Sequence, residues 1–162
     1  THIAGYHAGI VIRNALFKLP AKVAYHAVPW VTYTDPEIAH VGMTEKQAKE
    51  EHGDIRVLRF PLAENDRAQA ERETDGLIKV VTDKRGRILG ASIAAARAGE
   101  LLLPWVLAVD QKMKIGKMAG IIAPYPTMGE ISKRVAGTYF IPSLFNERTK
   151  KIVRLLLKWV PW

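Results

Sequence analysis

The sequence predicts an α+β fold, in which helices cover an antiparallel sheet of about four or five strands. Two observations carry this prediction. Residues 28–95 contain short alternating segments in the order strand, strand, helix, strand, strand, strand. The links between these segments are short, and short links join antiparallel neighbours into a meander.

Length and composition limit the number of cores and the kinds of site that the chain can form. The 162 residues are enough for one hydrophobic core, or for one core with an appendage. The chain has no cysteine, which excludes a disulfide framework and a thiolate nucleophile within it, and we predict no metal site. No signal peptide is visible, and we expect a cytoplasmic protein. Because the chain opens on Thr1 rather than Met, we expect a part of something longer.

The positive charge is unevenly distributed. The net charge is +8, and half of it lies in residues 146–162. The other charges are of mixed sign, as on an ordinary solvated surface. We find no nucleic-acid-binding motif and predict no nucleic-acid partner.

The first elements are a helix and a hairpin. Residues 4–18 place apolar side chains at helical spacing, with Thr1 as the candidate N-cap and Pro20 as the end. Residues 28–43 read as two strands around an Asp-Pro turn, and we expect His40 on the exposed surface of the second strand.

A short helix and three strands follow. Thr44 and Gln47 have the spacing of a capping box for a helix that ends at Gly53. The expected strands cover residues 55–62, 76–82 and 87–95, and a polar loop with a helical turn occupies residues 63–75.

Residues 98–112 form the next predicted helix. Leu102, Trp105, Val106 and Val109 lie on one stripe of it and should face the core. Pro104 sits early in this helix, where a missing amide costs least.

The chain then reaches a proline-rich corner. Pro124 and Pro126 stiffen the backbone around Tyr125. Thr127 and Glu130 fit a second capping box, so a helix should follow. The product is an exposed tyrosine one helical turn from a carboxylate. On local chemistry alone, this is a turn followed by a well-capped helix.

The same corner resembles a signature of the pyridine nucleotide-disulfide oxidoreductases, the flavoenzymes related to glutathione reductase, dihydrolipoamide dehydrogenase and mercuric reductase. Most members have His-Pro-Thr, two further residues and Glu. Pro126, Thr127 and Glu130 match, while Tyr125 stands where the His acts as general acid/base. A tyrosine at this corner is similar to mercuric reductase and its relatives.

Two further motifs are similar to the same family. They are Thr-x-Pro-Glu at residues 34–37 and Ala-Gly-Glu-Leu-Leu at residues 98–102. The resemblance implies three parts: residues 1–20 as the last helix of a preceding flavin domain, 21–145 as a dimerisation domain, and 146–162 as a basic C-terminal helix.

The resemblance also implies a function. A full-length enzyme would use FAD and NAD(P)H bound by upstream domains, since no Gly-x-Gly-x-x-Gly motif and no redox cysteine pair occur here. This stretch alone should bind no cofactor and be inactive. It should form a homodimer and contribute Tyr125 and Glu130 as catalytic residues to the partner subunit. The residues implied at the flavin are Thr1, His2, Tyr125 and Pro126.

Tyr125 would change the chemistry of that site. An unperturbed His titrates near pH 6.5 and a Tyr near pH 10, a handicap of about 3.5 units, or on the order of 5 kcal/mol, for accepting a thiol proton. A soft metal ion bound by thiolates needs no such proton transfer. Because the chain ends without the Cys pair usual in mercuric reductases, the substrate stays open between a disulfide, mercuric ion and another oxidant, as does the choice of NADH or NADPH.

Residues 146–162 leave two interpretations open. A basic amphipathic helix can pack its Leu and Trp side chains on its own domain or on the dimer mate, which we expect here. The alternative is a non-enzymatic dimer module whose helix binds a membrane surface or another acidic partner.

Overall fold

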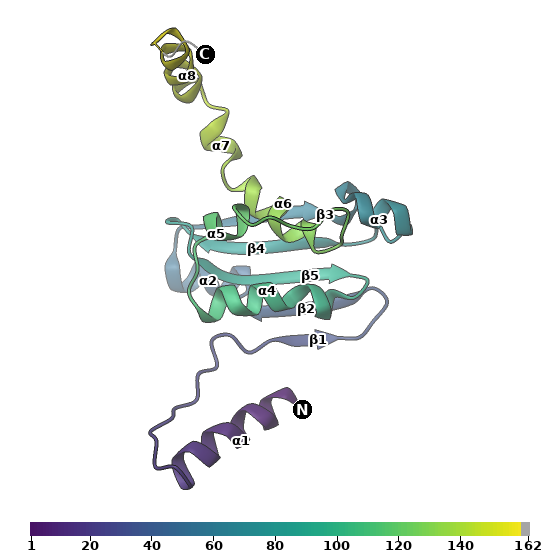
Figure 1. Ribbon diagram of the computed structural model, residues 1–162, viewed down its shortest axis with the longest axis vertical. Coiled ribbons are helices and arrows are strands. Elements are labelled where there is room, and N and C mark those ends of the chain that lie inside the picture. Colours follow the sequence, from purple (N-terminus) through teal and green to yellow (C-terminus); the bar gives the residue numbers. More distant parts are fainter. Residues whose placement is uncertain (160–162) are drawn as a thin grey trace.

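The computed structural model describes residues 1–159 (Figure 1). These residues form an antiparallel sheet with helices on both faces, which confirms the predicted α+β class. The strands are β1 (Trp30–Thr32), β2 (Glu37–Gly42), β3 (Ile55–Pro61), β4 (Leu77–Asp83) and β5 (Ile88–Ala95). The helices are α1 (His2–Ala15), α2 (Glu45–His52), η1 (Leu62–Glu64), α3 (Asp66–Glu71), α4 (Ala98–Asp110), α5 (Ile115–Ala119), α6 (Glu130–Thr138), α7 (Ile141–Leu144) and α8 (Glu147–Trp159).

The sheet has the strand order β1-β2-β5-β4-β3, and every neighbouring pair is antiparallel. β3, β4 and β5 form a meander, as expected. The chain leaves sequential order once, because α2 carries it from β2 to the far edge. β2 therefore pairs with β5, where Val41 lies opposite Ala91. The central strand β5 is the most buried, and its Ile93 is fully enclosed.

The main core lies between the sheet and α4, α5 and α6. Alternate strand residues such as Phe60, Ile78 and Ile93 point to this face and are buried. Trp105 of α4 is fully buried among them, and its indole Nε1 donates to Ser132 Oγ of α6 at 3.1 Å. This bond satisfies both polar groups and fixes α4 against α6.

α4 carries the predicted inward stripe, with Leu102, Trp105 and Val109 buried and Val106 partly buried. Its N-cap Arg97 makes no side-chain cap.

A carboxylate on β2 caps α4 across the fold. Glu37 Oε2 accepts a hydrogen bond from the Gly99 amide at 3.0 Å. It satisfies an amide that has no partner within the helix and places a negative charge at the positive end of the helix dipole. The two motifs at residues 34–37 and 98–102 therefore meet in space.

α2 covers part of the opposite face. Ala48 packs there against Val81 and Leu89. The predicted capping box of α2 is confirmed. Thr44 Oγ1 accepts from the Gln47 amide at 3.3 Å, and the Thr44 amide donates to Gln47 Oε1 at 2.9 Å.

His40 is buried, so the prediction of an exposed strand residue is wrong. Only 5% of it is accessible, because Trp30 lies over its ring at 5.5 Å between centroids. The ring nitrogens bond to Ser92 Oγ and to the Gly42 carbonyl, both at 2.9 Å. Burial lowers the pKa of His40; the bond to Gly42 opposes this shift, and the charge of Lys79 adds to it.

The two ends of the chain extend away from the sheet (Figure 1). α8 has no buried residue, and its chief contacts are with α7. The expectation that the C-terminal helix folds back is therefore wrong for its own domain. The last three residues of the predicted C-terminal helix, 160–162, lie outside the described residues. None of the helices within residues 1–159 has the length and apolar character to cross a membrane.

Replacing Glu37 tests the cap across the fold. Glu37→Ala should lower the free energy of unfolding by about 1–2 kcal/mol, because the Gly99 amide loses its partner. Glu37→Gln should lower it less, since an amide oxygen still accepts the bond. Urea denaturation measures both changes against Glu50→Ala, an exposed glutamate of α2. Equal stability of Glu37→Ala and the Glu50→Ala control would contradict the capping role.

The buried His40 should make stability depend on pH. Its pKa is lowered in the folded chain, so the unfolded chain takes up the proton first as the pH falls. The free energy of unfolding should therefore decrease below about pH 6.5 and level off once the folded form is also protonated. Denaturation at a series of pH values should show a shallower decrease for His40→Gln. Parallel curves for the two proteins would show that His40 does not contribute.

Candidate active-site corner

Tyr125 stands in the loop between α5 and α6, flanked by Pro124 and Pro126. Its side chain is 68% exposed, as the sequence predicts for this corner. The hydroxyl donates to Asp66 Oδ2 of α3 at 2.8 Å. The phenol is thus held at a fixed place while most of its ring remains accessible to a partner.

The neighbours of Tyr125 keep its phenol protonated. The hydrogen bond to Asp66 raises the pKa of Tyr125 above its usual value, and the Asp66 charge, desolvation and the Glu130 charge act in the same direction. Each of these favours the neutral form over a phenolate. At neutral pH the group is a hydrogen-bond donor and a poor proton acceptor.

Thr127 stabilises the corner itself and does not cap the helix, so the predicted Thr127–Glu130 capping box is wrong. α6 begins at Glu130, with Gly129 as its N-cap and no side-chain cap. Thr127 Oγ1 donates instead to the Pro124 carbonyl at 2.7 Å. The Glu130 amide bonds to the Thr127 carbonyl at 3.3 Å, a backbone bond that needs no particular side chain.

Asn65 holds the corner from the interior of the fold. Only 2% of it is accessible. Its Oδ1 accepts from the Ala68 amide at 2.9 Å and so caps α3, while its Nδ2 donates to the Thr127 carbonyl at 3.2 Å. Sequence reasoning assigned no role to Asn65 or Asp66. The Asn-Asp pair has the signal of a helix cap, but nothing local indicates its partner on the distant corner.

Glu130 is close enough for its charge to act on Tyr125, yet the phenol bonds to Asp66. Glu130 is the first residue of α6 and is partly buried. The structure therefore brings Tyr125, Pro126 and Glu130 together and adds Asp66 to them.

A cleft of about 440 Å³ opens beside this corner. Glu71 bridges two cations in its wall, accepting from Arg67 Nε at 2.6 Å and from Arg97 Nη2 at 2.8 Å. The bond to Arg67 is the main cause that lowers the pKa of Glu71. The residues that line the cleft are Arg67, Glu71, Ala96, Arg97, Glu100, Leu101, Pro126, Thr127 and Met128.

Thr1 and His2 lie elsewhere. They line a different cleft, of about 690 Å³, together with β1 and the outer side of α4. His2 Nε2 lies 3.0 Å from the Pro29 carbonyl. Thr1 is the N-cap of α1, as predicted, but its side chain makes no capping bond.

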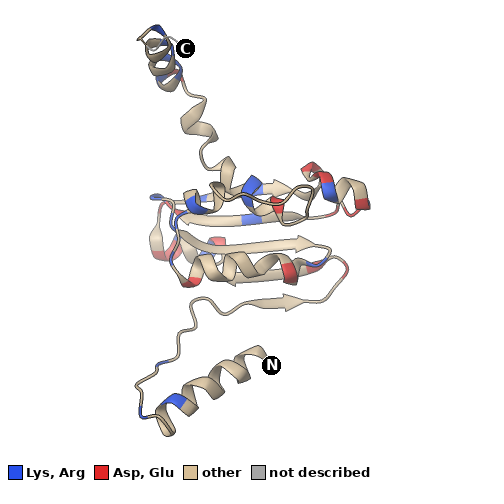
Figure 2. Cartoon of the chain, in the orientation of Figure 1, with Lys and Arg blue, Asp and Glu red and all other residues tan. Residues whose placement is uncertain are grey.

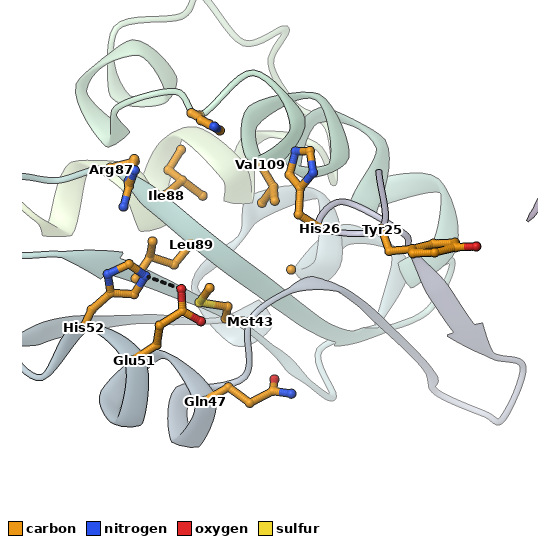
Figure 3. A pocket seen from close by; sticks show the side chains of 12 residues that line it. Tyr25, His26, Met43, Gln47, Glu51, His52, Arg87, Ile88, Leu89 and Val109 are labelled. Carbon is orange, nitrogen blue, oxygen red and sulfur yellow. Dashed lines mark ion pairs between the residues drawn. The ribbon is translucent and has the colours of Figure 1, made fainter. Parts of the chain in front are cut away.

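A third cavity, of about 440 Å³, lies between α2, the start of β5 and the end of α4 (Figure 3). Met43, Leu89 and Val109 form its apolar part, and His52 Nε2 stands 3.7 Å from Glu51 Oε1 at its edge. None of the site residues predicted from the sequence lines this cavity.

A family model defines the class of this fold. It describes the pyridine nucleotide-disulphide oxidoreductase dimerisation domain and matches residues 28–136. This range contains all five described strands and the corner with Tyr125. The chain belongs to this family.

Individual relatives agree with this assignment. A "Mercuric reductase" of Bacillus cereus is 40% identical over 139 residues, which are 85% of this chain and 22% of that protein. A "Dihydrolipoyl dehydrogenase" of Bacillus subtilis (strain 168) is 40% identical over 136 residues, 83% of this chain and 29% of that protein. The structure of the HOCl-induced flavoprotein disulfide reductase RclA from Escherichia coli is similar, with a TM-score of 0.76 and 28% identity, over 84% of this chain and 32% of that one. The chain thus spans less than a third of the curated relatives.

The raised pKa of Tyr125 can be measured directly. Asp66→Asn keeps a hydrogen-bond acceptor but removes the charge, so it should lower the pKa of Tyr125 toward its usual value. A pH titration of phenolate absorbance measures the change. Tyr125→Phe identifies the transition that belongs to this residue. An unchanged transition in Asp66→Asn would contradict the role of the Asp66 charge.

Proposed function

We propose that this chain is the C-terminal dimerisation domain of an FAD-dependent NAD(P)H:disulfide or metal-ion oxidoreductase. In this proposal, Tyr125 and Glu130 contribute to the active site of the partner subunit. The observation that carries it is the exposed phenol of Tyr125, held by Asp66 on a corner that Asn65 and Thr127 secure. The relatives named mercuric reductase and dihydrolipoyl dehydrogenase support the reaction class. A cytoplasmic location stays a prediction.

The environment of Tyr125 limits what it can do. Its hydroxyl donates a hydrogen bond to Asp66, so the oxygen lone pairs face outward unless that bond breaks. Since the pKa of Tyr125 is raised above its usual value, the phenolate that could accept a thiol proton is even less populated at neutral pH. The corner therefore favours a substrate that needs no proton shuttle, such as a soft metal ion carried by thiolates.

The proposed enzyme would bind FAD and NAD(P)H through domains upstream of this one. FAD would supply the two-electron chemistry between the nicotinamide and the redox thiols. From this chain, Thr1 and His2 would face the flavin of their own subunit, and Tyr125 and Pro126 that of the partner. The first turn of α1 fits such a role, because no side chain caps it and its amides can meet negative charge. Thr1 and His2 line one cleft and Pro126 lines another, which is consistent with this division.

The surface near the corner supports self-association. Ile122 is 97% exposed, and Ile121 beside it is also exposed. On α4, Leu103 and Leu107 point away from the core. Exposed apolar side chains of this kind are typical of an interface between permanent partners. We place the two-fold axis of a homodimer near residues 121–135.

The role of Tyr125 is tested in the whole protein that carries this domain. Tyr125→His should raise turnover of small disulfides by about tenfold or more, because a positioned acid/base is worth roughly a hundred- to ten-thousand-fold. Tyr125→Phe should change turnover while the free energy of unfolding stays within about 0.5 kcal/mol. Steady-state assays with disulfides and with mercuric ion measure both.

Glu130→Gln tests whether the Glu130 charge contributes to turnover, apart from the Asp66 carboxylate that bonds to the phenol. It should reduce turnover with little loss of stability, since the helix begins with a backbone bond.

The matched control for Tyr125→Phe is replacement of Tyr33, an exposed tyrosine of the first hairpin, by Phe. If both Tyr125 variants turn over every tested substrate at the unmodified rate, Tyr125 is a structural residue and the site assignment fails.

A further inference from the structure

α8 is an amphipathic helix whose apolar side has no partner within the described chain. No residue of α8 is buried, and the helix stands away from the sheet (Figure 1). Its exposed large apolar side chains are Ile152, Val153, Leu155, Leu156, Leu157 and Trp159. Water contact of so many apolar groups is unfavourable, so a partner must cover them.

Charge and apolar surface are separated around α8. At 3.6 residues per turn, the six apolar residues span an arc of about 200°. The arc of about 100° on the opposite side is cationic. It holds Lys150, Lys151, Arg154 and Lys158. Only the first turn departs from this division: Arg148 and Thr149 lie within the apolar sector, and Glu147 lies within the cationic sector, where it pairs with Lys150 at 2.7 Å.

The breadth of the apolar arc indicates the kind of partner. A seam between two helices uses a narrow stripe, and an arc of about 200° would remain mostly exposed in such a pair. A planar apolar medium covers the whole arc at once. Trp159, which combines an apolar ring with a polar N–H, suits the boundary of that medium.

The charge of α8 indicates the chemistry of the partner surface. Five Lys or Arg residues and one Glu give this helix a net charge of +4. On the sheet and its helices, acidic and basic residues are intermixed (Figure 2). The excess charge therefore lies on the same helix as the uncovered apolar face, which complements an anionic lipid surface.

We propose that α8 lies in the headgroup layer of an anionic lipid bilayer, with its apolar arc toward the acyl chains and its cations toward lipid phosphates. α7 extends this surface, because Ile141, Leu144 and Phe145 are exposed just before α8. The helix would attach the domain to the membrane surface. This inference rests on α7 and α8 and does not depend on the function of Tyr125.

Vesicle co-sedimentation of the 162-residue chain tests the proposal. The chain should bind vesicles that mix phosphatidylglycerol with phosphatidylcholine at least about tenfold more tightly than phosphatidylcholine alone, since each cation near the surface adds attraction. High salt should weaken this binding. Replacing the four cations Lys150, Lys151, Arg154 and Lys158 with Gln should abolish the preference. Leu156→Gln, at the centre of the apolar arc, should reduce binding to both vesicles.

A matched variant separates α8 from the total charge. It replaces four exposed cations of the body with Gln: Lys46, Lys49, Lys84 and Arg85. This variant should keep most of the binding and the preference. An equal loss in the two four-residue variants would overturn the proposal. The proposal would also be overturned if the unmodified chain bound no vesicles. If Leu156→Gln in addition changed the mass measured by sedimentation, the partner of α8 would be a second copy of the chain.

Discussion

The buried amide of Asn65 is the interaction on which the candidate site depends. Its oxygen starts α3, which carries Asp66, and its nitrogen holds the Thr127 carbonyl, which belongs to the corner of Tyr125. One enclosed side chain therefore sets the separation across which the phenol meets the carboxylate. Because the Asn65 side chain is almost fully enclosed, loss of these bonds would leave its buried amide without partners. The exposed part of the site is thus positioned from inside the fold.

Much of the fold could be predicted because its signals are local. Alternating burial follows from the pleat of each strand, so the strands around residues 35–36 and 83–86 were readable from their polarity. The capping box of Thr44 and Gln47 also needs only neighbours in sequence. The pairing of β2 with β5 was not readable in the same way, because it depends on the packing of strands that are far apart along the chain.

The wrong predictions for Thr127 and His40 involve partners that sequence spacing does not reveal. Thr127 had the spacing of a helix cap, but its hydroxyl bonds backwards to Pro124. His40 had the position of a surface residue, but Trp30 on the neighbouring strand lies over it. Asp66 lies 59 residues from Tyr125, so only the folded chain shows that the phenol has a carboxylate partner other than Glu130.

The core explains why α8 can serve a separate purpose. The main core cluster runs from Ala39 to Ala136, within the range that the family model matches, and α1, α7 and α8 contribute none of its described residues. Substitutions on α8 therefore leave the packing of the sheet and its covering helices intact. The separation of apolar and cationic residues around α8 then requires a cause outside that core. Two α8 helices reach one surface in any dimer of this domain whose two-fold axis runs along the membrane normal. The second contact would then be intramolecular, so that two individually weak helices hold the assembly more firmly than either alone.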